Sequence, residues 1–179
     1  MNENKIIIDT LKPFLPTVKN WIIDYVKEHS LESKTVSEFG FSRLLQYFPK
    51  TILDTARVVI IDKVKMIPLS QLGIPWFGDF ESMDAIGVTY MNTYFVNKNY
   101  VNQESIHFHE LVHIVQWYHL GIDAFVLLYG LGLKKHGYQR SPLEFQAYSL
   151  QERFETSENN FDVPMQIIPS LDNLVMEIV

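Results

Sequence analysis

The spacing of hydrophobic positions in the first part of the chain predicts a helix followed by a strand. From Phe14 to His29 apolar residues recur every three or four positions, which is typical of an amphipathic helix that buries one face. A further helical turn is expected from Phe41 to Tyr47, because Pro49 stops the helix shortly after it. Residues 56–62 form a short β-branched run, which predicts a strand.

Beyond residue 84 the pattern first alternates and then returns to a helical period. Ala85 to Val96 predicts a β-hairpin whose turn lies near Met91-Asn92-Thr93, because asparagine tolerates turn conformations. Gln103 to His119 predicts a helix, with Asn102 as its N-cap and Gly121 as its C-terminal stop.

Two more helices are expected before the C-terminus. The first runs from Asp123 to Leu133, and the second runs from Ser141 to Glu155 and begins with Ser-Pro. The tail after Asn159 contains Pro164 and Pro169 and is expected to be irregular. A strand, a hairpin and then three helices indicate an α+β fold rather than alternating βαβ units.

Composition limits the kinds of site and partner that the chain can have. The 179 residues carry a formal net charge of −6, which argues against a nucleic-acid partner. The chain has no cysteine, so any metal ligands must be His, Asp or Glu side chains. Neither a signal peptide nor a membrane span is recognisable, because the longest apolar stretch, Ala124 to Leu133, is too short. We therefore expect a soluble, cytoplasmic protein.

One motif in the helix at residues 103–119 carries metal chemistry. His109 and His113 are four residues apart and project from one helix face, where both imidazoles can reach one metal ion. Glu110 lies about 100° around the helix, so it can act as a general base on a water that zinc acidifies. The surrounding helix is apolar nearly all round, and burying these polar groups is costly without a metal. A metal-free His–Glu network is the alternative.

Residues alone leave the third ligand open. His119 stands six residues after His113 but points away from the ligand face if the helix continues. Glu144 is the stronger candidate, yet Ser141-Pro142-Leu143-Glu144 is also a capping-box pattern, in which the glutamate would close back on its own helix. Tyr148, one turn after Glu144, either donates a hydrogen bond to an oxyanion or packs in the core.

A wider set of residues resembles a known group of proteins. The segment His109-Glu110-Leu111-Val112-His113-Ile114-Val115-Gln116, then Tyr138, then Pro142-Leu143-Glu144-Phe145-Gln146-Ala147-Tyr148, looks like compact bacterial zincin-like domains of the gluzincin type. The likeness covers about residues 87–153, and Met91 stands where a glycine is common. The resemblance implies that Glu144 is the third zinc ligand. It also implies a zincin-like fold, with a small β-sheet before the HExxH helix and a later helix that bears the glutamate.

These observations predict the organisation and activity of the chain. We expect an N-terminal helical extension at 1–54, a zincin-like metal-binding core at 55–160, and an irregular tail at 161–179 packed on that core. The predicted function is a zinc-dependent metallopeptidase acting on a peptide or protein substrate, with Glu110 as base and Tyr138 or Tyr148 stabilising the tetrahedral intermediate. The alternative is a non-catalytic zinc-binding interaction domain. The oligomeric state is left open.

The aromatic loop from Pro68 to Phe80 has two interpretations. Its residues Pro75-Trp76-Phe77-Gly78-Asp79-Phe80 either pack in the core or line a substrate pocket, and core packing is the preferred interpretation. The predicted strand from Ala85 to Tyr90 could also offer an edge to an extended peptide.

Overall fold

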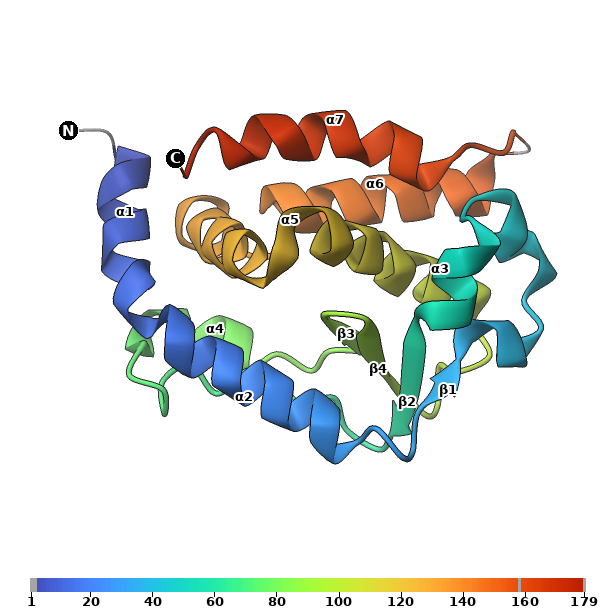
Figure 1. Ribbon diagram of the computed structural model, residues 1–179, viewed down its shortest axis with the longest axis horizontal. Coiled ribbons are helices and arrows are strands. Elements are labelled where there is room, and N and C mark those ends of the chain that lie inside the picture. The colour runs from blue at the N-terminus through green and yellow to red at the C-terminus, as the bar shows by residue number, and fades with distance from the viewer. Residues whose placement is uncertain (1–2, 158, 179) are drawn as a thin grey trace.

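The computed structural model describes residues 3–157 and 159–178 and has the α+β architecture that the sequence predicts (Figure 1). A small sheet lies on one side of a long central helix, and further helices cover the other side. The elements in chain order are α1 (Glu3–Leu11), α2 (Leu15–Glu28), β1 (Lys34–Thr35), α3 (Lys50–Thr55), β2 (Arg57–Ile61), α4 (Gly78–Glu81), β3 (Gly87–Tyr90), β4 (Thr93–Asn97), α5 (Glu104–His136), α6 (Pro142–Thr156) and α7 (Val163–Val175). Short 3₁₀ turns occur between them, including η3 (Ser42–Gln46) and η4 (Pro75–Phe77).

The sheet has the strand order β1-β2-β4-β3 and mixes both strand directions. β2 runs parallel to β4, whereas β3 and β4 form the predicted antiparallel hairpin, with Tyr90 opposite Thr93. Met91 begins the two-residue turn with φ of 60°, in the left-handed region that favours glycine. Methionine thus occupies a turn position where glycine is the usual residue. In the strand order, β3 is an edge strand.

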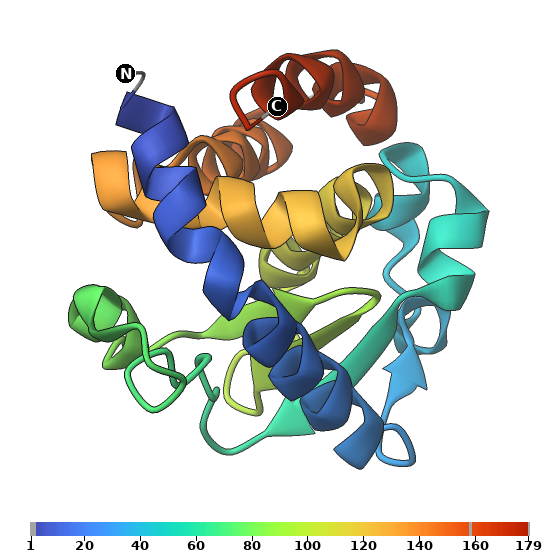
Figure 2. The same ribbon diagram turned by 60° about the vertical axis from the view of Figure 1, so that its left-hand side comes forward.

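The long helix α5 forms the centre of the protein and is bent at Gly121 (Figures 1 and 2). Gly121 has φ of 71° and ψ of 169°, which are not helical, so the two predicted helices meet at the predicted break. The N-cap is Gln103 and not Asn102, which corrects that prediction by one residue. Among the described residues, α5 is the one helix long and apolar enough to cross a membrane, but 56% of its most apolar stretch is buried in the fold.

The prediction of an irregular tail after residue 160 was wrong, because this segment contains helix α7. Asp162 caps the helix by accepting a hydrogen bond from the backbone N–H of Met165 (2.8 Å). Pro164 lies in the first turn, where its missing N–H costs nothing, and Pro169 is accommodated inside the helix. The buried residues Val163, Ile167 and Leu171 are spaced by four, which is the helical signal that outweighed the two prolines.

The N-terminal residues also join the main core. Helix α2 confirms the predicted helix, whereas α1, α3 and β1 were not predicted. Ile8 and Leu11 of α1, and Val18 and Ile22 of α2, are buried in one core with α5. β1 pairs with β2, so residues 1–54 contribute a strand to the sheet as well as helices.

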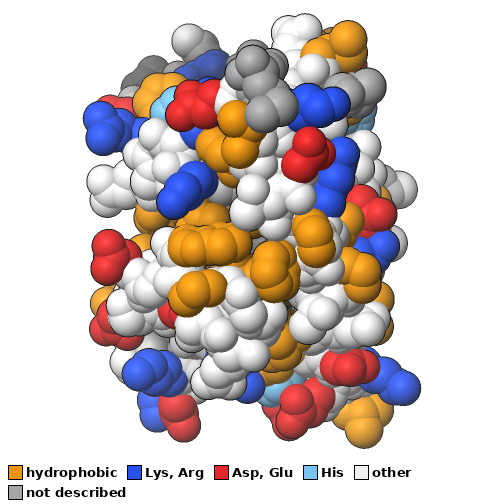
Figure 3. Space-filling model, turned by 90° about the vertical axis from the view of Figure 1, so that its left-hand side faces the viewer, with side chains coloured by type: hydrophobic (Ala, Val, Ile, Leu, Met, Phe, Trp, Pro, Cys, Tyr) orange, Lys and Arg blue, Asp and Glu red, His pale blue; other side chains and the backbone are white. Residues whose placement is uncertain are grey.

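The end of the molecule at the left of Figure 1, where α1, α2 and α4 lie, carries an apolar surface. Figure 3 shows that hydrophobic side chains gather across the middle of this face, with charged side chains around them. Ile6 and Trp76 are large hydrophobic residues of α1 and η4, and each is 47% exposed. Of the aromatic residues in the predicted loop at Pro68–Phe80, Phe77 and Phe80 are buried in the core, whereas Trp76 is exposed.

Candidate metal centre

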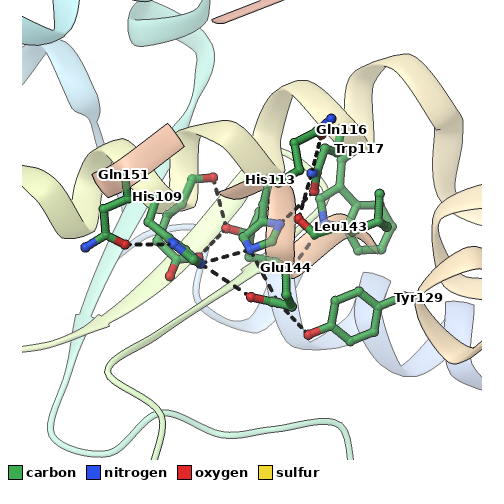
Figure 4. Close-up of polar contacts among 11 residues, drawn as sticks. His109, His113, Gln116, Trp117, Tyr129, Leu143, Glu144 and Gln151 are labelled. Carbon is green, nitrogen blue, oxygen red and sulfur yellow. Dashed lines mark hydrogen bonds and ion pairs between the residues drawn. The ribbon is translucent and has the colours of Figure 1, made fainter. Parts of the chain in front are cut away.

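The packing of α6 against α5 brings three predicted ligands together (Figure 4). His109 and His113 project from one face of α5, and Glu144 projects toward them from the first turn of α6. One nitrogen or oxygen atom from each of the three side chains lies within 4.8 Å of the others. All three residues are buried.

The separations of these atoms match those of ligands around one tetrahedral ion. The two Nε2 atoms of His109 and His113 are 3.1 Å apart, and the Glu144 oxygens lie 3.4 and 3.5 Å from them. Zinc binds such atoms at about 2.0–2.2 Å, so two ligands in a tetrahedron are separated by about 3.4 Å. The donor set of two imidazoles and one carboxylate is one that zinc accepts.

The hydrogen bonds of Gln116 fix the proton position on His113. The amide nitrogen of Gln116 donates to the backbone carbonyl of Leu143 (3.0 Å), an atom that can only accept. Its amide oxygen therefore faces His113, and His113 Nδ1 donates to it (2.8 Å). The neutral ring then carries its lone pair on Nε2, directed at the cluster. Gln116 therefore supports the site by orienting His113.

Gln151 fixes His109 in the same way. Its amide nitrogen donates to the Glu155 carboxylate (3.1 Å), so its oxygen accepts from His109 Nδ1 (3.0 Å). The Nε2 lone pairs of His109 and His113 consequently converge on one point. Among the described residues, the second carboxylate oxygen of Glu144 is buried there without a hydrogen-bond donor. Such a concentration of lone pairs requires a proton or a metal ion.

Charge at the centre changes the acidity of its members in opposite directions. Burial raises the pKa of the Glu144 carboxyl, but the two nearby imidazoles outweigh this and hold its pKa well below the ordinary value. Burial lowers the pKa of His113, yet the Glu144 and Glu110 carboxylates and the hydrogen bonds at its ring raise it to about 9. In the metal-free protein a proton on His113 thus takes the place of the cation.

Glu144 does not form the capping box that its local sequence allowed. Ser141 is the N-cap of α6, but within the described part of the chain its side chain makes no capping hydrogen bond. The Glu144 carboxylate instead accepts a hydrogen bond from the Tyr129 hydroxyl (2.6 Å) and faces the two histidines. The folded chain therefore directs this side chain into the cluster.

Glu110 lies against the edge strand β3 beside the cluster. Thr89 Oγ1 donates to Glu110 Oε2 (2.6 Å), and the indole of Trp117 donates to the Thr89 carbonyl (3.2 Å). Burial raises the pKa of Glu110, while His109, His113 and the Thr89 hydrogen bond partly offset this. A carboxylate with a raised pKa is suited to accept a proton near neutral pH.

The two predicted tyrosines lie at different depths. Tyr148 is 41% exposed, and its ring packs 4.5 Å from the ring of His109. Tyr138 is half-buried, lies near Glu144, and its ring packs edge to face with that of Tyr148 at a centroid distance of 6.4 Å. Burial raises the pKa of both hydroxyls, so each stays protonated and able to donate.

His107 and His119, also on α5, have partners elsewhere. His107 is buried between the Tyr94 hydroxyl (2.6 Å) and the Val101 carbonyl (2.7 Å), as expected of a structural residue. His119 pairs with Asp172 of α7 (2.6 Å) and lies outside the ligand cluster.

Sequence reasoning missed three residues that support the site, namely Thr89, Tyr129 and Gln151. Gln151 follows Glu144 by seven positions, so a helical projection of α6 would have placed both on one face. Thr89 and Tyr129 approach from β3 and from beyond the bend of α5, and their spacing in the sequence gives no signal.

Comparison of the chain with models of protein families, with curated proteins and with solved structures finds no match.

Zinc binding is expected to release about one proton per chain at pH 7.5. His113 carries a proton in the metal-free protein because its pKa is about 9, and zinc requires the lone pair that this proton occupies. Titration calorimetry in buffers of different ionisation enthalpy measures the number. Proton release on zinc binding should disappear as the pH rises above about 9. If no proton were released at pH 7.5, His113 would not be protonated in the metal-free protein.

The same pKa determines how the metal-free protein responds to pH. Folding raises the pKa of His113 from 6.5 to about 9, so the stability that its proton contributes is complete below about pH 6.5. This contribution is lost as pH rises through about 9.

Replacing Gly87 with alanine is expected to lower the free energy of unfolding by about 1–3 kcal/mol, as overpacking does. A Cβ atom on Gly87 would lie 2.9 Å from Cδ of Glu110, which the Thr89 hydrogen bond holds in place. Urea denaturation measures the loss. Gly78→Ala is the matched control, because a Cβ there meets nothing within 4 Å and φ is −58°. Equal stability of the two variants would contradict the close contact.

Proposed function

We propose that this protein is a zinc-dependent metallohydrolase that cleaves peptide bonds, built on a zincin-like arrangement. The observation that supports it most is the convergence of two imidazole lone pairs and an unpartnered carboxylate oxygen at tetrahedral ligand spacing, with Glu110 beside them. A structural zinc site has no use for a glutamate next to its ligands, whereas hydrolysis needs a base there.

His109, His113 and Glu144 would hold the ion. When bound, zinc supplies Lewis acidity, which polarises a carbonyl group and acidifies a water molecule. Glu110 accepts the proton of the attacking water and passes it to the leaving amine. Thr89 keeps the Glu110 carboxylate in one orientation during this transfer.

Tyr138 and Tyr148 supply the donors for the negative charge that develops on the carbonyl oxygen. Both hydroxyls remain protonated; Tyr138 lies near Glu144, and the ring of Tyr148 packs against that of His109. A single positioned donor of this kind typically contributes about 10²- to 10³-fold in rate.

A second candidate function is a non-catalytic zinc-binding interaction domain. The observation that favours it is burial, because the exposed fractions of His109, Glu110, His113 and Glu144 are only 6%, 4%, 5% and 3%. A substrate must therefore reach the centre through an interior space rather than across an open surface.

Zinc content and peptide cleavage together separate the two functions. The purified full chain is analysed for zinc per chain, then incubated with a mixed peptide library whose new termini are identified by mass spectrometry. One zinc per chain with cleavage supports the hydrolase. One zinc without cleavage supports the interaction domain, and a chain that neither contains nor takes up zinc overturns both.

A further inference from the structure

A cavity of about 90 Å³ opens directly onto the candidate metal centre. His109, Glu110, His113 and Glu144 form its polar side. Apart from these and Thr89, the described residues that line it are apolar, aromatic or glycine, with no lysine or arginine among them. The centre thus faces an apolar space, although protein interiors contain few voids larger than a water molecule.

The apolar walls come from the N-terminal helices, to which the sequence assigned no role at the site, and from the aromatic loop, for which lining a substrate pocket was one of two interpretations. Leu11, Phe14 and Val18 line the cavity from the region of α1 and α2, while Phe77 and Phe80 line it from the aromatic loop. These segments are far apart in the sequence, yet α1 and α2 contact α5 (Figure 2), and Phe80 packs against Tyr129 of α5 at a ring distance of 5.7 Å.

An aromatic pair connects the cavity wall to the protein surface on this side. Phe14 lines the cavity and packs edge to face with Trp76 at a ring distance of 6.1 Å. Trp76 itself is 47% exposed.

We propose that this cavity binds one branched aliphatic side chain of the substrate, so that the preferred substrates are peptides with leucine or a residue of similar size beside the cleaved bond. The inference rests on the proposed function for the bond that is cleaved. The apolar lining excludes charged side chains, and an acidic one would also approach Glu110 and Glu144.

Size restricts the ligand further. A cavity of about 150 Å³ lined by similar side chains accommodates benzene. The 90 Å³ here is smaller, which suits the four carbons of a leucine side chain better than an indole or a long acyl chain.

Binding of small amides tests the pocket without requiring catalysis. The full chain is titrated with N-acetyl-leucinamide, N-acetyl-alaninamide and N-acetyl-aspartamide, and binding is followed by NMR of the protein amides. The leucine probe is expected to bind about 10- to 100-fold more tightly than the alanine probe. Equal affinity for leucine and alanine, or tighter binding of hexadecanamide than of the leucine probe, overturns the proposal.

Filling the cavity should remove this selectivity. Val18→Phe fills the cavity from α2, and Val126→Phe fills it from α5. If one variant does not fold, the other still tests the pocket. Each is expected to weaken leucine binding at least tenfold while zinc content stays unchanged. Ile23→Phe is the matched control, because Ile23 is 44% exposed on α2. Unchanged leucine binding in both folded cavity variants would overturn the pocket.

Hydrolysis assays distinguish failure of the pocket from failure of the proposed function. Peptides that differ only at the residue beside the cleaved bond are incubated with the zinc-loaded chain. Cleavage without preference for leucine over alanine overturns the pocket and leaves the hydrolase. Selective binding of the leucine probe without any cleavage overturns the hydrolase and supports the pocket.

Discussion

Replacing Glu110 with glutamine is expected to lower the rate of peptide hydrolysis by about 10²- to 10⁴-fold while zinc content stays at one per chain. Glutamine has nearly the same shape and can still accept the hydrogen bond from Thr89 through its amide oxygen. It cannot accept a proton from water, so the loss should appear in kcat, with KM little changed.

Two measurements accompany this variant. Zinc is quantified by atomic absorption, and initial rates are measured with a peptide that the unaltered protein cleaves. Glu152→Gln is the matched control, because Glu152 lies on the exposed face of α6 and should leave both values unchanged. A rate within threefold of the unaltered protein would remove Glu110 from the role of base. Loss of zinc would instead place Glu110 among the ligands.

Replacing Glu144 with alanine is expected to weaken zinc binding by more than 100-fold. Outer partners of metal ligands typically contribute about 10- to 100-fold in affinity, and a direct ligand should exceed that range. The loss follows from geometry, because the Glu144 oxygens lie 3.4 and 3.5 Å from the two imidazole nitrogens. Two histidines alone would leave two positions of a tetrahedral ion to water.

Competition with a chelator of known affinity measures this change. Circular dichroism of the metal-free variant checks that the fold is kept, and Glu152→Ala serves as the control on the same helix. Zinc affinity within tenfold of the unaltered protein would exclude Glu144 as a ligand. The same titration tests the charge at the centre, since without Glu144 the pKa of His113 should fall and less proton should be released.

Local sequence rules were sufficient where neighbouring residues determine the conformation. The apolar spacing predicted α2, the Ser-Pro start predicted α6, and the β-branched run and the alternating pattern predicted β2 and the hairpin β3–β4. The rules failed for α7, where two prolines were given more weight than a four-residue apolar spacing and an aspartate cap. They also failed for α1 and α3, which are short helices stabilised mainly by packing.

For the candidate site, the geometry of one helix was enough to predict the pair His109 and His113 with Glu110 beside them. Their arrangement depends only on the geometry of one helix, in which residues four apart share a face. The break of α5 at Gly121 was equally local, because few residues other than glycine adopt that conformation.

The orientation of Glu144, in contrast, depends on how the helices pack. Its side chain had two partners available, its own helix terminus and the two histidines, and the local sequence favoured neither. The packing of α6 on α5 decided it, because the carboxylate lies where two imidazoles and Tyr129 face it. The same holds for Gln151, Thr89 and the apolar cavity, since contacts between distant segments depend on how the helices pack.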